Sequence, residues 1–471
     1  MLGLLPCDRA WPRRASARVR VRGSMHEQQA TESLRPGFDS SRTNHLNVSR
    51  RSLLAGLPAV ALRAQQRQPN LLVIVADDHG WNDLGCYGHP VVRTPHLDRM
   101  AADGVRFTHC YTTAPLCSPG RGAVMTGLYP HVSGVTRLVQ GEDAARLSLR
   151  PGLWTFAKGL EELGYVNAAA RKWHLSTAGA LPHGFHHEFP SRETYLEQAE
   201  AFLEQRHDRP FCLYFCPTHT HRPFRSHSGF EYSPDDVAHC LPPYLKDTPQ
   251  VREHYSWYLS EISKMDDEIG RLLAALQRSG ELDQTVVAFL TDHGPSLHRA
   301  KFSLYDWGTH SSLIMRGPGV TGSGRVDTGL ASTIDVGPTL LGLAGGAAPS
   351  SCQGVDLGPR LAGRDAKQRS LVFSEHHENN YLTAVRGERF KLIRNHTKDE
   401  PLVSARNVRN WQGMDADTLR QPYPLPRPDR ELFDLAADPL ESRNLADDPA
   451  YRDQLVKLES ELDRWSALPR R

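Results

Sequence analysis

Four short apolar runs in the first two thirds of the chain each end in a polar cluster. The runs occupy residues 71–76, 166–170, 211–216 and 285–290. Each is as long as a strand and apolar almost throughout, which is typical of strands buried on both faces of a sheet. The polar clusters that follow them occupy residues 77–78, 171–174, 217–221 and 291–294. We therefore expect four buried strands whose carboxyl ends carry polar side chains.

Helical patterns separate these runs. Residues 153–163, 195–205 and about 251–278 repeat apolar positions every three or four residues, as one face of a helix does. Strands that alternate with helices predict an α/β fold with a large, mostly parallel sheet flanked by helices. Because ligands bind outside the carboxyl ends of the strands in such sheets, we expect the four polar clusters to meet at one functional edge.

The pattern changes after residue 345. A Gly- and Pro-rich stretch is followed by short apolar runs that predict strands at residues 371–374, 382–385 and 389–393. Residues 449–468 carry apolar side chains on one helical face. These elements predict a smaller antiparallel sheet with a helix. The predicted organisation is a leader at 1–67, a catalytic domain at 68–348 and a C-terminal subdomain at 349–471.

Charge is distributed unevenly along the 471 residues. Residues 1–67 contain 12 Arg and no Lys against 4 Asp or Glu, a charge of +8, whereas the whole chain carries +2. Residues 68–471 therefore carry −6. A mildly acidic body argues against nucleic acid as a partner, because nucleic-acid binding needs a basic face.

The basic leader has the features of an export signal. Paired arginines at 50–51 precede a short apolar run, and residues 59–61 form a small-x-small cleavage site, as in bacterial twin-arginine signals. The alternative, a membrane anchor, needs about 20 apolar residues, and Pro58 and Arg63 interrupt this run. We therefore predict export by the twin-arginine machinery to the periplasm or the medium, with no transmembrane anchor.

Acidic residues at two strand ends predict a metal site. Asp77, Asp78 and Asp292 supply three carboxylates, and His293 adds an imidazole. Sites rich in carboxylate oxygens suit Ca²⁺ or Mg²⁺, whereas zinc usually takes more nitrogen or sulfur ligands. Ca²⁺ is our first choice and Mg²⁺ the second. The alternative is that the Asp pair caps a turn or helix, but two adjacent carboxylates at a buried strand end raise each other's pKa unless a cation intervenes.

A cysteine stands in an unusual setting within the segment LCSPGRGAVMTG at 116–127. Pro119 suits the first turn of a helix, so the thiol of Cys117 is expected at the positive end of a helix dipole and near Arg121. This setting lowers a thiol pKa and attracts anionic oxygens. The alternative is an inert buried cysteine. A cysteine hydrolase is less favoured, because thiolates pair poorly with hard cations.

The segment Cys117-Ser118-Pro119-Gly120-Arg121 resembles the C-x-P-x-R signature of sulfatases. Further segments resemble the same family in the same order, at 69–88, 94–111, 171–176, 221–224, 285–294, 332–345, 385–395 and 431–446. The resemblance covers nearly everything after about residue 68. It implies an alkaline phosphatase-like sandwich with a smaller C-terminal subdomain. It also implies hydrolysis of sulfate esters or sulfamates, with sulfated carbohydrates as the substrate class.

The resemblance also implies the chemistry of Cys117. In this family the cysteine is oxidised to formylglycine, so the protein would need a formylglycine-generating enzyme as a partner. An aldehyde hydrate carries two hydroxyls on one carbon: one attacks sulfur, and the other later expels sulfate by re-forming the carbonyl. A serine in the same place would accept the group but would lack this exit.

The matching positions imply the remaining site residues. For the cation they are Asp77, Asp78, Asp292, His293 and an oxygen of the oxidised Cys117. For the hydrate, the sulfate and the leaving oxygen they are Arg121, Lys172, His174, His221 and Lys301. His219 is an alternative to His221, and His221 is favoured because its His-x-Pro context fits the family pattern.

Some positions depart from the family pattern and leave alternatives open. Gly120 and Gly122 replace small residues of the signature, and Arg171 and Ser176 replace glycines around the Lys-Trp-His-Leu segment. These changes concern substrate shape and modification more than reaction type. A phosphomonoester or phosphonate monoester hydrolase of the same superfamily is the alternative enzyme, and a silent sugar-binding relative with an unmodified thiol is the alternative class. Residues 298–319 resemble N-sulfoglucosamine sulfohydrolases.

Overall fold

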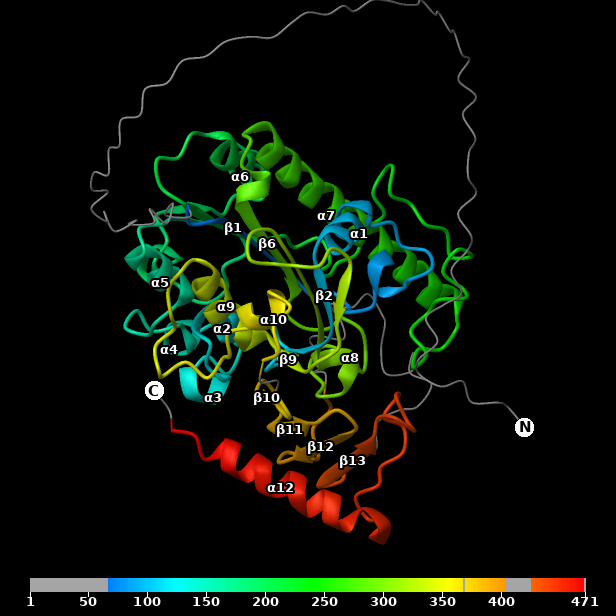
Figure 1. Cartoon of the computed structure of the whole chain (residues 1–471). Helices are drawn as coiled ribbons and strands as arrows, with labels where there is room; N and C mark the ends of the chain where they lie inside the picture. Colours follow the sequence, from blue (N-terminus) through cyan, green and yellow to red (C-terminus); the bar gives the residue numbers. More distant parts are fainter. Residues whose placement is uncertain (1–66, 367–368, 403–424, 470–471) are drawn as a thin grey trace, which may run out of the picture. The chain divides into compact units, whose positions relative to one another are not determined.

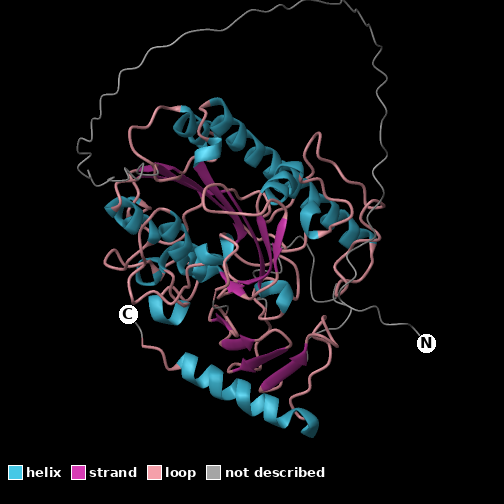
Figure 2. Cartoon of the chain, viewed as in Figure 1, coloured by secondary structure: helices cyan, strands magenta, loops and turns pink. Residues whose placement is uncertain are grey.

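The computed structural model describes residues 67–366, 369–402 and 425–469. They form a large mixed sheet with helices on both faces and a four-stranded antiparallel sheet (Figure 1, Figure 2). Strands of the large sheet follow the order β4-β3-β5-β1-β6-β7-β2-β8, and β9 pairs with β2. Their bounds are β1 Asn70–Ala76, β2 Val105–Tyr111, β3 Val166–Arg171, β4 His187–Phe189, β5 Phe211–Cys216, β6 Thr285–Thr291, β7 His310–Arg316, β8 Arg325–Asp327 and β9 Ala331–Ser332.

Strand β1 lies in the middle of the large sheet and is buried on both faces. Its even-numbered apolar side chains, such as Leu72 and Ile74, join the core under α1, α6 and α7. Its odd-numbered ones, such as Leu71 and Val73, join the core under α2, α5 and α9. The four strands predicted from apolar runs are therefore present and parallel to one another, and the expectation of a mostly parallel sheet is confirmed.

Five strands of the large sheet do not form continuous apolar runs, and β2 and β7 are the longest of them. In β2 polar side chains alternate with apolar ones, and β7 begins with His310, Ser311 and Ser312. Strand β7 runs antiparallel to both β6 and β2. The sheet is thus mixed at this end, because the connection over residues 292–309 returns the chain in the opposite direction.

The helices cover both faces of the sheet, and their ends follow local capping chemistry. The side chain of Thr248 accepts a hydrogen bond from the Val251 N–H, and Pro249 occupies the first turn, so α7 begins two residues before the predicted start. The α-helices of this part are α1 Pro95–Asp103, α2 Cys117–Thr126, α3 Pro130–Ser133, α4 Ala144–Leu147, α5 Phe156–Glu162, α6 Tyr195–Glu204, α7 Pro249–Arg278, α8 Asp306–Thr309, α9 Val336–Leu343 and α10 Gly358–Leu361. The 3-10 helices are η1 Gly85–Tyr87, η2 Leu181–His183, η3 Leu282–Gln284 and η4 Thr333–Asp335.

The smaller sheet has the predicted antiparallel pairing. Its order is β10-β11-β12-β13, with β10 Val372–His376, β11 Leu382–Arg386, β12 Phe390–Asn395 and β13 Arg430–Asp434, and the chain continues into η6 Pro449–Tyr451 and α12 Arg452–Ser466. The apolar face of α12 packs on this sheet in a core that also contains Leu128 and Tyr129, which follow α2. The sheet is therefore joined to the segment that carries Cys117. The boundary at 348/349 stays a prediction.

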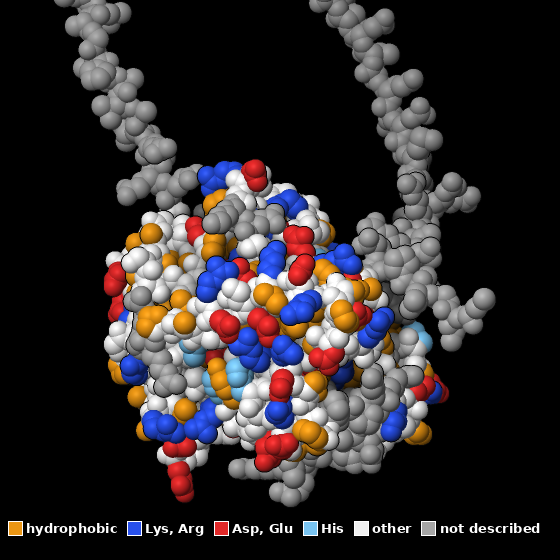
Figure 3. All heavy atoms as spheres, turned by 90° about the horizontal axis from the view of Figure 1, so that it is seen from below, with side chains coloured by type: hydrophobic (Ala, Val, Ile, Leu, Met, Phe, Trp, Pro, Cys, Tyr) orange, Lys and Arg blue, Asp and Glu red, His pale blue; other side chains and the backbone are white. Residues whose placement is uncertain are grey.

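The leader and its export signal lie outside the described residues. Across the described ranges, every helix is too short or too polar to traverse a bilayer. On the face shown in Figure 3, Lys and Arg side chains are interspersed with Asp and Glu side chains among the atoms that are described.

Gly127 follows the last residue of α2 and packs closely against Cys352. Its φ of 64° is left-handed, and an added Cβ would collide with the Sγ of Cys352. We expect Gly127→Ala to lower the free energy of unfolding by about 1–2 kcal/mol in urea titrations. Gly134, with φ 85° and open space around it, is the matched control. Gly134→Ala should lose less, and equal losses would contradict the collision.

Candidate active site

The polar clusters at the strand ends meet at one edge of the large sheet, as predicted. Residue Ala76 of β1 pairs with Thr291 of β6, so Asp77 and Asp292 follow side by side. The Asp78 N–H donates to Asp292 Oδ1 over 3.1 Å. Strands β3 and β5 lie next along the sheet and bring Lys172, His174 and the segment around His221 to the same edge.

Half of the six described non-glycine residues with left-handed φ lie at these strand ends. Asp78, Arg171 and His174 have left-handed φ angles of 56°, 73° and 56°. Such conformations cost about 1–3 kcal/mol each in residues other than glycine and are typical of functional sites. Arg171 stands where the resembling family has glycine, which adopts this conformation without strain. The chain therefore keeps a charged side chain at this position despite its cost.

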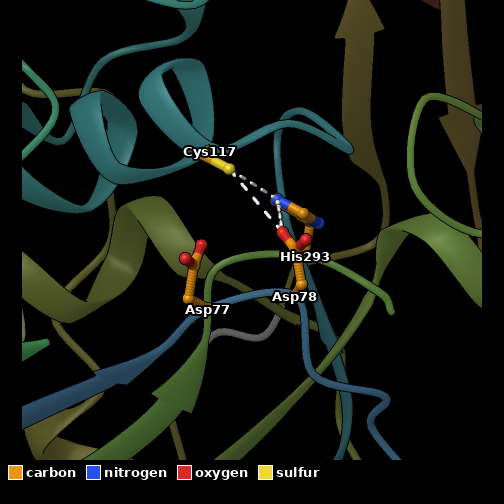
Figure 4. A group of neighbouring side chains, drawn as sticks. All are labelled: Asp77, Asp78, Cys117 and His293. Atoms are coloured by element: carbon orange, nitrogen blue, oxygen red, sulfur yellow. Dashed lines mark hydrogen bonds and ion pairs between the residues drawn. The ribbon is translucent and has the colours of Figure 1, made fainter. Parts of the chain in front are cut away.

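Helix α2 begins at Cys117 and places the thiol above the acidic strand ends. Four side chains offer donor atoms that lie within 4.8 Å of one another: Asp77, Asp78, Cys117 and His293. Figure 4 shows them pointing into a common space, with Cys117 descending from α2 and the others rising from the sheet edge. The Cys117 Sγ lies 3.6 Å from Asp78 Oδ1 and 3.4 Å from His293 Nε2. This donor set fits one small divalent cation.

Asp292 lies next to these four side chains but is not one of the group whose donor atoms lie within 4.8 Å of one another. Its Oδ1 accepts the backbone N–H of His293 over 2.9 Å and lies 3.6 Å from His293 Nε2. Its Oδ2 accepts a hydrogen bond from Arg121 Nε over 2.9 Å. Four of the five predicted ligands are thus gathered around one point, and the fifth is in contact with them.

Lysine ammonium groups neutralise the carboxylates of the site. The Lys172 ammonium lies 2.6 Å from Asp77 Oδ2, and the Lys301 ammonium lies 2.6 Å from both oxygens of Asp78. Burial raises the pKa of Asp77 and of Asp78, but Lys172 and Lys301 respectively outweigh it and hold both pKa values low. Burial raises the pKa of Asp292 to about 7 despite the nearby Arg121. Lysines therefore separate the adjacent carboxylates, a contribution that the sequence argument assigned to a metal alone.

The thiol of Cys117 is activated, though by other groups than expected. It is 1% exposed, and burial raises its pKa, but Lys172 and Lys301 outweigh this and lower it to about 7. From the sequence alone, the helix dipole and Arg121 are the expected causes of this shift. The two ammonium groups are the main cause because α2 presents Cys117 directly above the pairs that they form with the acidic residues.

The histidines of the site differ in charge and exposure. Burial lowers the pKa of His174 to about 3, so its ring is neutral, and its Nδ1 has no hydrogen-bond partner among the described residues. His221 is partly exposed, and its Nε2 lies 3.9 Å from Asp78 Oδ2. His219 instead lies 3.2 Å from Glu261 and 2.8 Å from Glu268, both on α7. Of the two alternatives, His221 is the one that faces Asp78.

A cavity of about 610 Å³ opens beside this edge. Asp77, Lys172, His174 and His221 line it on the side of the strand ends, and residues of α7 line it elsewhere. Its size suits one or two sugar units. A substrate held there would lie next to the acidic cluster.

Three residues that were not predicted from the sequence support the site. Ser296 donates to Asp78 Oδ2 through its hydroxyl, and Thr220 donates to the Asp77 carbonyl over 2.5 Å. The Arg222 Nε in turn donates to the Ser296 carbonyl over 2.7 Å. Thr220 and Arg222 flank His221 in sequence, which was the available signal, whereas Ser296 is an ordinary loop serine in the sequence.

Two family models match the chain. The model described as Sulfatase matches residues 69–347, and the model described as N-sulphoglucosamine sulphohydrolase, C-terminal, matches residues 297–403. An ulvan-active sulfatase of Formosa agariphila is 28% identical over 473 residues, with 88% of this chain and 77% of the relative covered. Arylsulfatase A of Homo sapiens is 30% identical over 479 residues, with 84% and 86% covered.

Solved structures share the fold. The phosphonate monoester hydrolase of Agrobacterium radiobacter matches with a TM-score of 0.67 and 21% identity, over 85% of this chain and 95% of its own. A protein solved with its substrate D-glucosamine-2-N,6-O-disulfate matches with a TM-score of 0.65 and 21% identity, over 85% and 97%. At these identities the likeness concerns the fold alone, and the expected alkaline phosphatase-like sandwich is confirmed.

Proposed function

Because the chain belongs to the sulfatase family, we propose that it removes sulfate groups from carbohydrates at the site around Cys117. The observation that carries this proposal is the meeting of Cys117 with Asp77, Asp78 and His293 in one buried cluster. Relatives named for ulvan and for N-acetylglucosamine-6-O-sulfate support a sulfated glycan as the substrate class. The cavity beside the cluster has room for such a residue.

Two groups would complete the site. The proposed ligands Asp77, Asp78, Asp292 and His293 would hold Ca²⁺ as first choice, with Mg²⁺ as the alternative, because oxygen ligands dominate. Cys117, oxidised to formylglycine, would replace a soft sulfur by oxygen, which suits a hard cation. When bound and formed, these groups supply Lewis acidity and a geminal diol as the nucleophile.

The side chains of the chain would then stabilise and orient the transferring group. Lys172 and Lys301 hold their ammonium groups at the carboxylates below Cys117. There they would stabilise the negative charge that grows on the sulfuryl oxygens, which is usually a large part of catalysis. Arg121, fully buried against Asp292 and Asp77, would keep this arrangement rigid.

Two histidines would handle protons and orientation. The neutral ring of His174 has an Nδ1 that meets no hydrogen-bond partner in the described part of the chain, which suits a hydrogen bond to the hydrate. His221 is partly exposed and lines the cavity, so it can reach a leaving oxygen or nitrogen. We propose that His221 or Lys301 protonates this group as it departs.

Removal of divalent metal provides a test of the cation. Dialysis against EDTA is expected to lower kcat by about 100-fold, since a bound cation stabilises transition-state charge by several kcal/mol. Added Ca²⁺ should restore activity more fully than Mg²⁺. The Asp78→Asn variant should respond to neither ion. Full activity after complete metal removal, checked by mass spectrometry of the metals, would contradict the cation.

The leaving group distinguishes the candidate reactions. The match to the N-sulphoglucosamine sulphohydrolase model at residues 297–403 favours a sulfated amino sugar, carrying either an N-sulfate or an O-sulfate. Phosphorus ester hydrolysis is the second candidate, because a phosphonate monoester hydrolase shares the fold. Parallel assays with glucosamine N-sulfate, glucosamine 6-sulfate and matched phosphate and phosphonate esters would separate them. Turnover of the phosphorus esters alone would reject the proposal.

Maturation and export are part of the same proposal. A formylglycine-generating enzyme would oxidise Cys117, and the twin-arginine machinery would carry the chain to the periplasm or the medium. Mass spectrometry of the peptide around residue 117 from the native host tests the first step. An intact thiol there would favour the silent sugar-binding alternative. Cell fractionation tests the second step.

A further inference from the structure

A second group of metal-ligating side chains lies on another wall of the same cavity. His219 and His227 come from the loop after β5, and Glu261 comes from α7. Their donor atoms lie within 4.8 Å of one another. We propose that these three residues bind a second metal ion, of the Zn²⁺ class, separate from the cation at the strand ends.

The donor types and their spacing fit zinc. Two imidazoles and one carboxylate with an open fourth position are a common set of zinc ligands in enzymes. The ligand atoms of a tetrahedral zinc site lie about 3.3 Å apart, as follows from metal–ligand bonds of about 2.0 Å. Here Glu261 Oε2 lies 3.2 Å from His219 Nδ1 and 2.7 Å from His227 Nε2. Small side-chain shifts would therefore seat the ion.

Contacts behind the three ligands hold them in place. The second ring nitrogen of His219, Nε2, lies 2.8 Å from Glu268 Oε1, and Glu268 Oε2 accepts the Tyr195 hydroxyl over 2.6 Å. A carboxylate behind a histidine is the usual support of a zinc-binding imidazole, because it fixes the ring and raises its basicity. Glu261 is supported as well, since its Oε1 accepts the Arg225 N–H over 2.9 Å.

The site opens into the cavity. The side chains of His219 and His227 are 21% and 27% exposed, whereas that of Glu261 is 5% exposed. All three line the cavity that also contains Lys172 and His221. A metal held there would fasten the loop after β5 to α7. Its fourth position would face a hydroxyl, carboxylate or sulfate oxygen of a sugar in the cavity.

The nitrogen-rich site would select a different metal from the first one. The strand-end cluster offers the carboxylates of Asp77 and Asp78, with Asp292 in contact, and carboxylate oxygens suit Ca²⁺ or Mg²⁺, whereas imidazole suits Zn²⁺. The rival state is metal-free. In that state Glu261 and Glu268 outweigh burial and raise the pKa of His219 to about 9. The charged histidine then forms ion pairs with the two glutamates.

Zinc stoichiometry tests the proposal without an activity assay. The full chain in a Cys117→Ala background, which removes the thiol as a zinc ligand, is saturated with Ca²⁺ and titrated with Zn²⁺ by calorimetry. We expect one molar equivalent of Zn²⁺ to bind. His227→Ala in the same background should lose it. His239→Ala, which removes an exposed histidine of the same loop region, is the matched control and should keep it.

A direct measurement covers the case in which His227→Ala fails to fold. Crystals of the Cys117→Ala protein soaked with Zn²⁺ should give an anomalous peak at the zinc edge between His219 Nδ1 and Glu261 Oε2. Absence of any bound equivalent, or a peak confined to the strand-end cluster, would overturn the proposal. Neither result depends on whether the enzyme is a sulfatase, so failure here leaves the proposed function intact.

Discussion

Replacement of Cys117 by alanine is expected to lower kcat for a sulfate ester by about 10⁶-fold, the scale on which loss of a covalent nucleophile acts. The thiol stands at the first turn of α2, within 3.6 Å of Asp78 and 3.4 Å of His293. Among the described residues the cluster offers only carboxylates and an imidazole besides it. The reaction would therefore lose its nucleophile while the substrate still binds.

Two further variants make this result interpretable. Cys117→Ser should show a stoichiometric burst of released alcohol and then stop, because a serine ester has no second hydroxyl to expel sulfate. Cys240→Ala is the matched control, since this half-buried thiol hydrogen-bonds only to the Val237 carbonyl among described residues. It should retain full activity. Steady turnover by Cys117→Ala would remove Cys117 from the mechanism.

Loss of Lys301 is expected to have the second largest effect. Its ammonium group is almost fully buried, lies 2.6 Å from both Asp78 oxygens and lowers the pKa of Cys117. Lys301→Ala should lower kcat by about 10²–10³-fold, as for the loss of one preorganised donor to a developing anion. The effect on KM should be smaller. Steady-state kinetics with an aryl sulfate measure both.

The control for Lys301 separates chemistry from folding. Lys264, which pairs with Asp267 on the solvent side of α7, should tolerate alanine with unchanged kcat. The melting temperature of Lys301→Ala should be recorded in parallel, because the variant leaves Asp78 without its main counterion. A loss below about tenfold, equivalent to about 1.4 kcal/mol, would argue against a direct role of Lys301.

The sequence predicted the central strands because they are buried on both faces. β1, β3, β5 and β6 form uninterrupted apolar runs, and the structure places their ends within one or two residues of the predicted ones. β2 and β7 were missed for a physical reason. They lie toward one side of the sheet, where polar side chains such as Thr108 and Ser312 find hydrogen-bond partners within the fold.

The candidate site was predictable as far as it follows the chain. Asp77, Asp78, Asp292 and His293 directly follow strands, so their meeting could be inferred from topology. Contacts between segments that are distant in the sequence could not be inferred in this way. Lys301 pairs with Asp78, which lies 223 positions earlier in the chain. The sequence around Lys301 does not differ from that of a loop whose lysine is exposed to solvent.

The proposed zinc ligands His219, His227 and Glu261 were even less predictable from the sequence. Glu261 and Glu268 lie on α7 at ordinary helical spacing, and such residues usually face water. In the structure both glutamates instead contact histidines: Glu261 contacts His219 and His227, and Glu268 contacts His219. Nothing in the spacing of the four residues along the chain indicates a common point.

The near-complete enclosure of Cys117, at 1% exposure, has a consequence for biosynthesis. The proposed maturation enzyme could not bind the peptide around Cys117 once α2 has packed and the C-terminal core has formed around the segment that follows it. Oxidation would thus have to compete with folding of the nascent polypeptide. The yield of active molecules would then be decided by timing, and slower growth or a lower expression temperature should raise it.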